Sequence, residues 1–189
     1  MSQRALRSLV VGFALLFAAP AARASPVVDR LVAVVDETPM FLSELRARAK
    51  PHRLRIDAQK PDAARRAALE AQVYRELLDK MIEEELIGRA AKAAHINVTD
   101  AEIDAAVALM SKATNLSREA FFAEVARQGF TEPEYRAEVG RQLLEGKWLQ
   151  SKAPPPPGAK PEEAAAHLEA ERRRLVRGLR EQAFVEVRL

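Results

Sequence analysis

VVDRLVAVVD, residues 27–36, and FVEVRL, residues 184–189, are the strongest β-strand patterns in this 189-residue chain, and they lie near its opposite ends. The first is rich in β-branched residues, and the second alternates apolar with charged side chains. Since a lone strand leaves its backbone groups without partners, the two segments are predicted to pair with each other. Val185, Val187 and Leu189 would then face the helices. Two independent, frayed tails are the alternative.

The sequence between the two strands is predicted to be almost entirely helical. The chain has only seven glycines and many Ala, Leu, Glu and Arg residues, which favour helices. Pro51 is predicted to end a short first helix, because the residue before a proline is pushed out of the helical conformation. The six predicted helices run from residue 43 toward 50, from 61 to 94, from caps at 99, 117 and 131, and from 161 to 181. The predicted fold class is mostly α, with a small sheet that pairs the terminal strands.

Residues 1–24 have the pattern of a secretory signal peptide. Arg4 and Arg7 precede an apolar run over residues 9–19, and the small residues that follow fit cleavage between Ala24 and Ser25. The apolar run is too short to span a bilayer as a helix, although a retained membrane anchor is the alternative. The pattern predicts export from a bacterial-type cytoplasm, with no integral membrane span once the signal is removed.

The exported chain is predicted to form one domain from three segments of sequence. Residues 25–151 hold the first strand and five helices, residues 152–160 are a linker with four consecutive prolines, and residues 161–189 add the last helix and strand. Residues 1–24 carry the whole excess of positive charge, and the remainder has 27 charges of each sign. This balance argues against a nucleic-acid partner, which needs a basic face.

No catalytic or metal-binding motif is found. The absence of cysteine excludes disulfides, a thiol nucleophile and a Cys-based zinc site. His52, His95 and His167 lie in different segments without metal-ligand spacing, so no metal or other cofactor is predicted. Glu83, Glu84 and Glu85 suggest acid–base chemistry at first sight, but consecutive helical residues fan around the axis. They are interpreted as a solvated face paired with Lys80 and Arg89.

Five aromatic side chains are the candidates for binding a partner. Half of all the aromatics fall within 28 residues, and these are Phe121, Phe122, Phe130, Tyr135 and Trp148. One interpretation is that they pack the helical core. The other is that part of the cluster lines an exposed apolar groove, which is what holding an unfolded chain requires.

The order of elements resembles the core module of the SurA family of periplasmic chaperones. The resemblance covers nearly all of residues 26–189 except the proline linker, and lies in the order of several moderate matches. Four stretches carry it: VVDRLVAVVDETPMFLSEL (27–45), LLDKMIEEELIGRAAKAAHINVTDAEIDAAV (77–107), NLSREAFFAEVARQGFTEPEYRAEVGRQLL (115–144) and AFVEVRL (183–189). Members of the family usually insert parvulin-type peptidyl-prolyl isomerase domains before the C-terminal helix. Here residues 151–161 fill that place, too few for an independent domain.

The resemblance implies a function. We expect a holdase-type chaperone that buries apolar segments of unfolded outer-membrane or secreted proteins in a cleft between the helical body and the strand-bearing C-terminal part, without isomerase activity. The alternatives are an isomerase-family protein with degenerate or lost catalysis, and an assembly subunit with one fixed partner. A monomer and a dimer that swaps its last helix and strand through the proline hinge are both compatible with the sequence.

Overall fold

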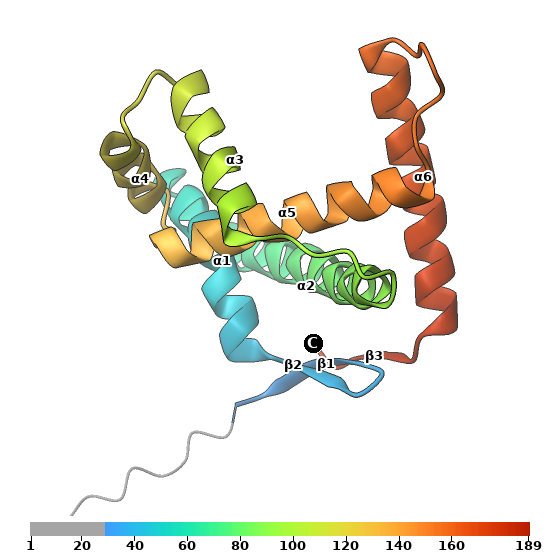
Figure 1. The fold of residues 1–189 in the computed structure, drawn as a ribbon. Coiled ribbons are helices and arrows are strands. Elements are labelled where there is room, and N and C mark those ends of the chain that lie inside the picture. The colour runs from blue at the N-terminus through green and yellow to red at the C-terminus, as the bar shows by residue number, and fades with distance from the viewer. Residues whose placement is uncertain (1–28) are drawn as a thin grey trace, which may run out of the picture.

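The computed structural model describes residues 29–189, so the predicted signal peptide and its cleavage site at Ala24 and Ser25 lie outside the described residues. Six helices and three strands are present in this part of the chain (Figure 1). In chain order they are β1 (Leu31–Val35), β2 (Thr38–Phe41), α1 (Leu42–Ala58), α2 (Ala63–Ala93), α3 (Asp100–Ala113), α4 (Arg118–Arg127), α5 (Glu132–Lys152), α6 (Pro161–Gln182) and β3 (Val185–Val187). The prediction of a mostly helical fold is confirmed.

The predicted pairing of the two terminal segments is also confirmed. Strand β1 lies in the middle of an antiparallel sheet of order β2-β1-β3, and Val35 is opposite Val185 in the β1–β3 ladder. Strand β2 was not predicted, since only the two terminal segments were expected to form strands. Asp36 adopts a φ of +51° in the turn between β1 and β2, a conformation that Asp tolerates better than most residues. The chain can therefore reverse at once and pair Thr38 with Val35.

Helix α1 contradicts the prediction that Pro51 ends it. The helix begins at Leu42 and continues through Pro51 to Ala58. Proline removes one hydrogen bond from a helix interior and normally bends or breaks it. Here Pro51 is buried and packs beside Gly129, and Asp57 beyond it is bound by Arg66 of α2 at 2.5 Å. Tertiary contacts thus hold the second half of α1 in line.

Helix α2 is the central element, because it packs against α1, α5, α6 and the sheet. The glutamates Glu83–Glu85 lie where these elements meet, and the interpretation of them as a solvated face is wrong for Glu84, whose side chain is only 10% exposed. Each glutamate accepts a hydrogen bond from a different element: Glu83 from Arg172 of α6, Glu84 from Arg48 of α1, and Glu85 from Thr38 of β2. The predicted pairs of this run with Lys80 and Arg89 are present as well.

The helices after α2 begin at the predicted caps. Thr99 and Thr131 each form a capping box, and the Ser117 hydroxyl accepts a hydrogen bond from the N–H of Ala120. Gly129 follows α4 with a φ of +95°, as expected of a residue that ends a helix in the left-handed region.

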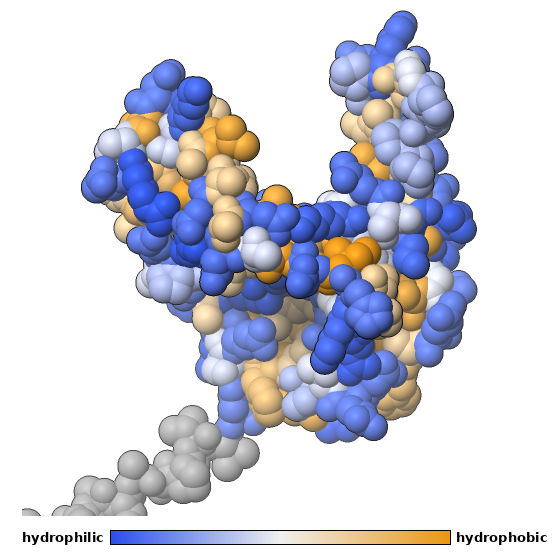
Figure 2. Space-filling model, in the orientation of Figure 1, coloured by the Kyte–Doolittle hydropathy of each residue, from blue (hydrophilic) through white to orange (hydrophobic). Residues whose placement is uncertain are grey.

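The helices form two arms that rise from a common base (Figure 1). Helices α3 and α4 make one arm, while the first half of α6 and the linker of residues 153–160 make the other. Figure 2 shows the open hollow between them, with polar side chains over most of this face. The buried side chains form three clusters, centred on the sheet with α1 and α2, on the meeting of α2, α5 and α6, and on the α3–α4–α5 arm.

Candidate functional site

Four of the five predicted aromatic residues lie together in the α3–α4–α5 arm. Phe121 and Phe122 come from α4, Phe130 from the turn after it, and Tyr135 from the first part of α5. Each of the three phenylalanine rings contacts the Tyr135 ring edge to face, with centroids 5.6, 6.4 and 6.1 Å apart. These are the arrangements that aromatic quadrupoles favour. The cap at Thr131 fixes where α5 begins and so places Tyr135 in the centre.

The cluster has a buried side and a partly exposed side. Phe121 is buried in the core, whereas Phe122, Phe130 and Tyr135 are half-buried. The guanidinium of Arg118 lies 5.1 Å from the centre of the Phe122 ring. The Tyr135 hydroxyl donates a hydrogen bond to the Met110 Sδ at 3.3 Å, and burial raises the pKa of this hydroxyl above its ordinary value. Part of the cluster therefore packs the core, while the other part remains accessible at the surface.

Trp148 lies apart from the other four aromatics. It is 2% exposed and packs where α2, α5 and α6 meet, beside Ile87, Leu149 and Val176. A partner could contact its ring only if the surrounding helices moved. Its ring belongs to the cluster that joins α5 to α2 and α6.

A cavity of about 400 Å³ opens next to the aromatic cluster, between α1, α2 and α5. Phe130 and Tyr135 form its apolar wall together with Leu77. Its other wall is charged, with Lys80 2.7 Å from the carboxylate of Glu138. The cavity thus combines an apolar face with fixed charges of both signs.

The charged wall of this cavity is held in one ionisation state. Burial by itself raises the pKa of Glu138, but hydrogen bonds from Lys80, Arg141 and Gln142 outweigh burial and bring the pKa to about 2. His52 lines the same cavity, and its pKa is lowered by burial first and by the nearby Arg55 next. At neutral pH Glu138 is therefore ionised and paired with Lys80.

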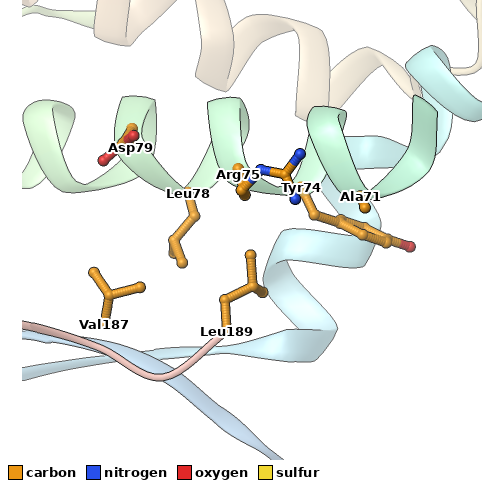
Figure 3. Close-up of a pocket in the computed structure, with 7 residues that line it drawn as sticks. All are labelled: Ala71, Tyr74, Arg75, Leu78, Asp79, Val187 and Leu189. Atoms are coloured by element: carbon orange, nitrogen blue, oxygen red, sulfur yellow. The ribbon is translucent and has the colours of Figure 1, made fainter. Parts of the chain in front are cut away.

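A second hollow, the β3 groove, lies between α2 and the last strand. It encloses about 520 Å³ and is lined by Ala71, Tyr74, Arg75, Leu78, Asp79, Val187 and Leu189. Figure 3 shows Val187 and Leu189 pointing up from the strand segment toward Leu78 on α2. Val187 is 51% exposed and Leu189 is 47% exposed, so water still reaches the apolar floor. The expectation that these two side chains face the helices is confirmed.

The α2 side of this groove was not predicted from the sequence. Ala71, Tyr74 and Leu78 recur at intervals of three and four, which marks one stripe of a helix. The periodicity alone does not show that the N-terminal turns of this stripe are left partly uncovered by the rest of the fold. Only the placement of β3 beneath α2 makes this surface half of a groove.

Each of the two hollows combines an apolar wall with charged side chains. Within residues 29–189, no three His, Asp or Glu side chains are grouped so that they could hold a metal ion. No helix in that range combines the length and apolar character needed to cross a membrane. Apolar walls with a polar rim are typical of sites that accept apolar groups of a ligand or chain.

The fold is a mostly helical module that is closed by its own terminal strands. Comparison with known families identifies the family of this module. Residues 3–149 match the SurA-like N-terminal domain family, and the chain belongs to this family. The resemblance drawn from the sequence is thereby confirmed.

Several curated relatives carry the name Chaperone SurA. The protein of Chromobacterium violaceum is 38% identical over 125 residues, which is 65% of this chain and 28% of the relative. The protein of Cupriavidus pinatubonensis is 34% identical over 119 residues, 63% of this chain and 23% of the relative. That of Legionella pneumophila (strain Lens) is 28% identical over 132 residues, 70% of this chain and 30% of the relative. The chain thus matches less than a third of the length of each.

Proposed function

We propose that this protein is a periplasmic holdase-type chaperone, which binds unfolded outer-membrane or secreted polypeptides and releases them unchanged. Membership of the SurA-like N-terminal domain family and relatives named chaperones support the class. The signal-like pattern of residues 1–24 supports the compartment. No bond is made or broken in this mechanism, so it needs neither a nucleophile nor a cofactor.

One observation carries the proposal, and it is the β3 groove. Val187 and Leu189 leave about half of their surface in water beside Tyr74 and Leu78 of α2. Exposed apolar surface costs free energy, about 25 cal/mol for each Å². An unfolded chain has the same cost along its apolar segments, so contact between the two surfaces relieves both. The groove lies between the helical body and the C-terminal strand.

The aromatic cluster is proposed as a second contact surface. Phe122, Phe130 and Tyr135 are half-buried and therefore offer ring edges without unfolding of the arm. Phe121 would support these rings from below, because it is only 7% exposed. Trp148 would contribute through the packing of α5, unless the helices around it open.

Suppression of aggregation tests the function. An unfolded β-barrel protein and an unrelated unfolded protein, each diluted from urea, are expected to scatter less light when the chain is present. Leu189→Asp places a charge in the groove and should weaken this protection for both clients. Leu109→Asp is the matched control, because Leu109 is 68% exposed on α3 and lies outside the groove; it should protect like the unaltered chain. Protection of neither client by the unaltered chain would refute the proposal.

Two further measurements separate this function from its alternatives. A protease-coupled assay with a prolyl peptide should show no isomerisation above background, and a clear rate would favour an isomerase. Purification from the periplasm should not yield one stoichiometric partner, as an assembly subunit would. Mass spectrometry of the protein recovered there should find an N-terminus at Ser25.

A further inference from the structure

Strand β3 has one paired edge and one open edge. In the sheet it pairs only with β1, and Glu186 lies opposite Val34. The Asp36 N–H donates to the Phe184 carbonyl at 2.7 Å, and the Arg188 N–H donates to the Val32 carbonyl at 2.8 Å. Residues 184, 186 and 188 therefore direct their backbone groups toward β1. Because these directions alternate along a strand, the N–H and C=O groups of residues 185 and 187 point toward the open edge.

The opposite edge of the sheet carries a proline, whereas the short β3 edge carries none. Pro39 of β2 lies opposite Val34, which already uses its backbone groups to bond Glu186. The nitrogen of Pro39 therefore faces away from β1, and it has no hydrogen to offer an additional strand. Proline on an outer edge is one of the ways in which proteins prevent unwanted pairing. The β3 edge has valines at the equivalent outward positions.

The β3 groove continues directly from this open edge. The side chains of Val187 and Leu189 point toward α2 (Figure 3), and their backbones border the edge. A strand laid beside β3 would place every second side chain under the α2 surface formed by Ala71 and Tyr74. These positions favour apolar residues, and the alternate positions would face water.

The charges of the groove also bear on which chain fits it, in addition to its preference for apolar side chains. Asp79 is neutralised by Arg180, whose nitrogen lies 2.9 Å away. Arg75 also lines the groove, and it forms no ion pair with any residue in the part of the chain that the structure describes. Arg75 is exposed, so an occupant with a carboxylate near one end would be able to pair with it.

We propose that the open edge of β3 accepts an extended segment of a client polypeptide as a fourth strand of the sheet. The client's backbone would bond residues 185 and 187, its alternate apolar side chains would fill the β3 groove, and an acidic side chain would approach Arg75. This inference rests on the proposed function and adds to it the part of the client that is bound and the bonds that bind it. Backbone bonding makes the site tolerant of sequence, while the groove selects an apolar–polar alternation, which is the pattern of outer-membrane strands.

Peptide methylation tests the proposal on the unaltered protein. The probe is the capped peptide Val-Thr-Val-Thr-Val-Thr-Asp, and its affinity is measured by calorimetry. N-methylation of the valine amides, which face β3 in antiparallel pairing, should lower the affinity about tenfold or more, since each lost hydrogen bond costs about 1 kcal/mol. Methylation of the threonine amides should be tolerated. In hydrogen-exchange measurements, the amides of residues 185 and 187 should become protected when the parent peptide binds.

A variant of the chain tests the same edge. Val187→Pro removes the outward N–H but keeps an apolar side chain and leaves the bonds of Glu186 to β1 in place, much as Pro39 does on the other edge. Its melting temperature should stay near that of the unaltered chain, and its affinity for the peptide should fall about tenfold. Val187→Thr is the matched control, because it keeps both the amide and the β-branched shape.

The results distinguish this proposal from the function it rests on. Equal affinity of both methylated peptides, or unchanged exchange of residues 185 and 187, would overturn strand addition. A dimer that Val187→Pro converts to monomers would also overturn it, since the occupant would then be a second copy of the chain. If the chain protects clients and Val187→Pro protects them equally, strand addition is wrong and the chaperone function stands. If the peptide binds as a strand but no client is protected, strand addition stands and the chaperone function is wrong.

Discussion

Gly129 shows at the scale of one residue how a backbone conformation fixes the packing of two helices. Its φ of +95° is a conformation that side chains oppose, and a Cβ there would come within 3.3 Å of the Pro51 Cα and 2.6 Å of the Leu54 Cδ1. Gly129→Ala is therefore expected to lower the free energy of unfolding by about 1–2 kcal/mol. Urea denaturation at pH 7 measures this difference.

Gly146 is the matched control for that substitution. It lies within α5, and a Cβ at this position would meet no atom within 4 Å. Alanine favours a helix interior over glycine by about 0.5–1 kcal/mol, so Gly146→Ala should stabilise the protein. If both substitutions lowered the free energy of unfolding, the left-handed conformation of Gly129 would not be the cause of the loss in Gly129→Ala.

Glu138 is expected to make stability depend on pH. Its pKa of about 2 in the folded protein lies below the ordinary value of 4.5. The carboxylate therefore contributes stability above pH 4.5, and this contribution is lost as the pH falls from 4.5 toward 2. Glu138→Gln should cost about 1–2 kcal/mol at pH 7, since water screens part of the site, and almost nothing at pH 2.

The measurement is the difference in urea midpoint between the two proteins from pH 7 to pH 2. Glu37→Gln is the control, because Glu37 is exposed in the turn after β1 and forms no ion pair within residues 29–189. Its effect should be small at every pH. A Glu138→Gln difference that stays constant with pH would mean that the side chain contributes by packing and not by its charge.

At the scale of whole elements, the helix starts were predictable because their causes are local. Thr99, Ser117 and Thr131 each bond backbone groups three residues away, so a short stretch of sequence contains the whole interaction. The end of α1 was not predictable in this way. The local penalty of Pro51 is offset by its buried packing beside Gly129, a residue far along the chain.

The candidate site was less predictable than the fold. The alternation of residues 184–189 indicated a strand and the direction of its side chains, and the aromatic content of residues 121–135 indicated a cluster. Neither pattern contains the open edge of β3 or the α2 stripe above it. These features depend on which side of β1 the last strand pairs, and that choice follows from where α6 returns to the sheet.

Removal of β3 is the prediction at this scale. Deleting residues 184–189 takes away the partner of β1 and exposes Ala33 and Val35, both fully buried in the intact protein. The free energy of unfolding should fall by about 2–4 kcal/mol. Deleting only residues 188–189 keeps β3 and should cost much less. An unchanged melting temperature in the longer truncation would show that the terminal ladder adds nothing to stability.

At the scale of the whole molecule, two long helices join the three hydrophobic clusters. Helix α2 supplies Leu78 to the sheet cluster and Ile87 to the cluster at α6. Helix α5 supplies Trp148 to the latter and Val139 to the cluster of the α3–α4 arm. A helix shared by two clusters cannot unfold at one end without weakening the other. The described part of the chain should therefore unfold as one cooperative unit, although its outline is open.

The proline linker is the part of this unit that should matter least. Pro154–Pro157 are exposed, whereas α6 is held in place through Arg172 bound to Glu83 at 2.8 Å and Arg180 bound to Asp79 at 2.9 Å. Closing a loop depends only weakly on its length, so deletion of Pro154 and Pro155 should change the free energy of unfolding by less than about 1 kcal/mol.

Thermal unfolding and gel filtration together check this expectation. Ala153 provides the contrast, because it adjoins the prolines but is 7% exposed at the end of α5. Ala153→Glu would bury a charge without a partner and should destabilise the protein clearly. If the two-proline deletion proves equally damaging, the prolines make contacts that position α6. If it instead yields a stable dimer, the shortened hinge has sent α6 and β3 to a second molecule, and the closed chain described by the β1–β3 ladder depends on linker length after all.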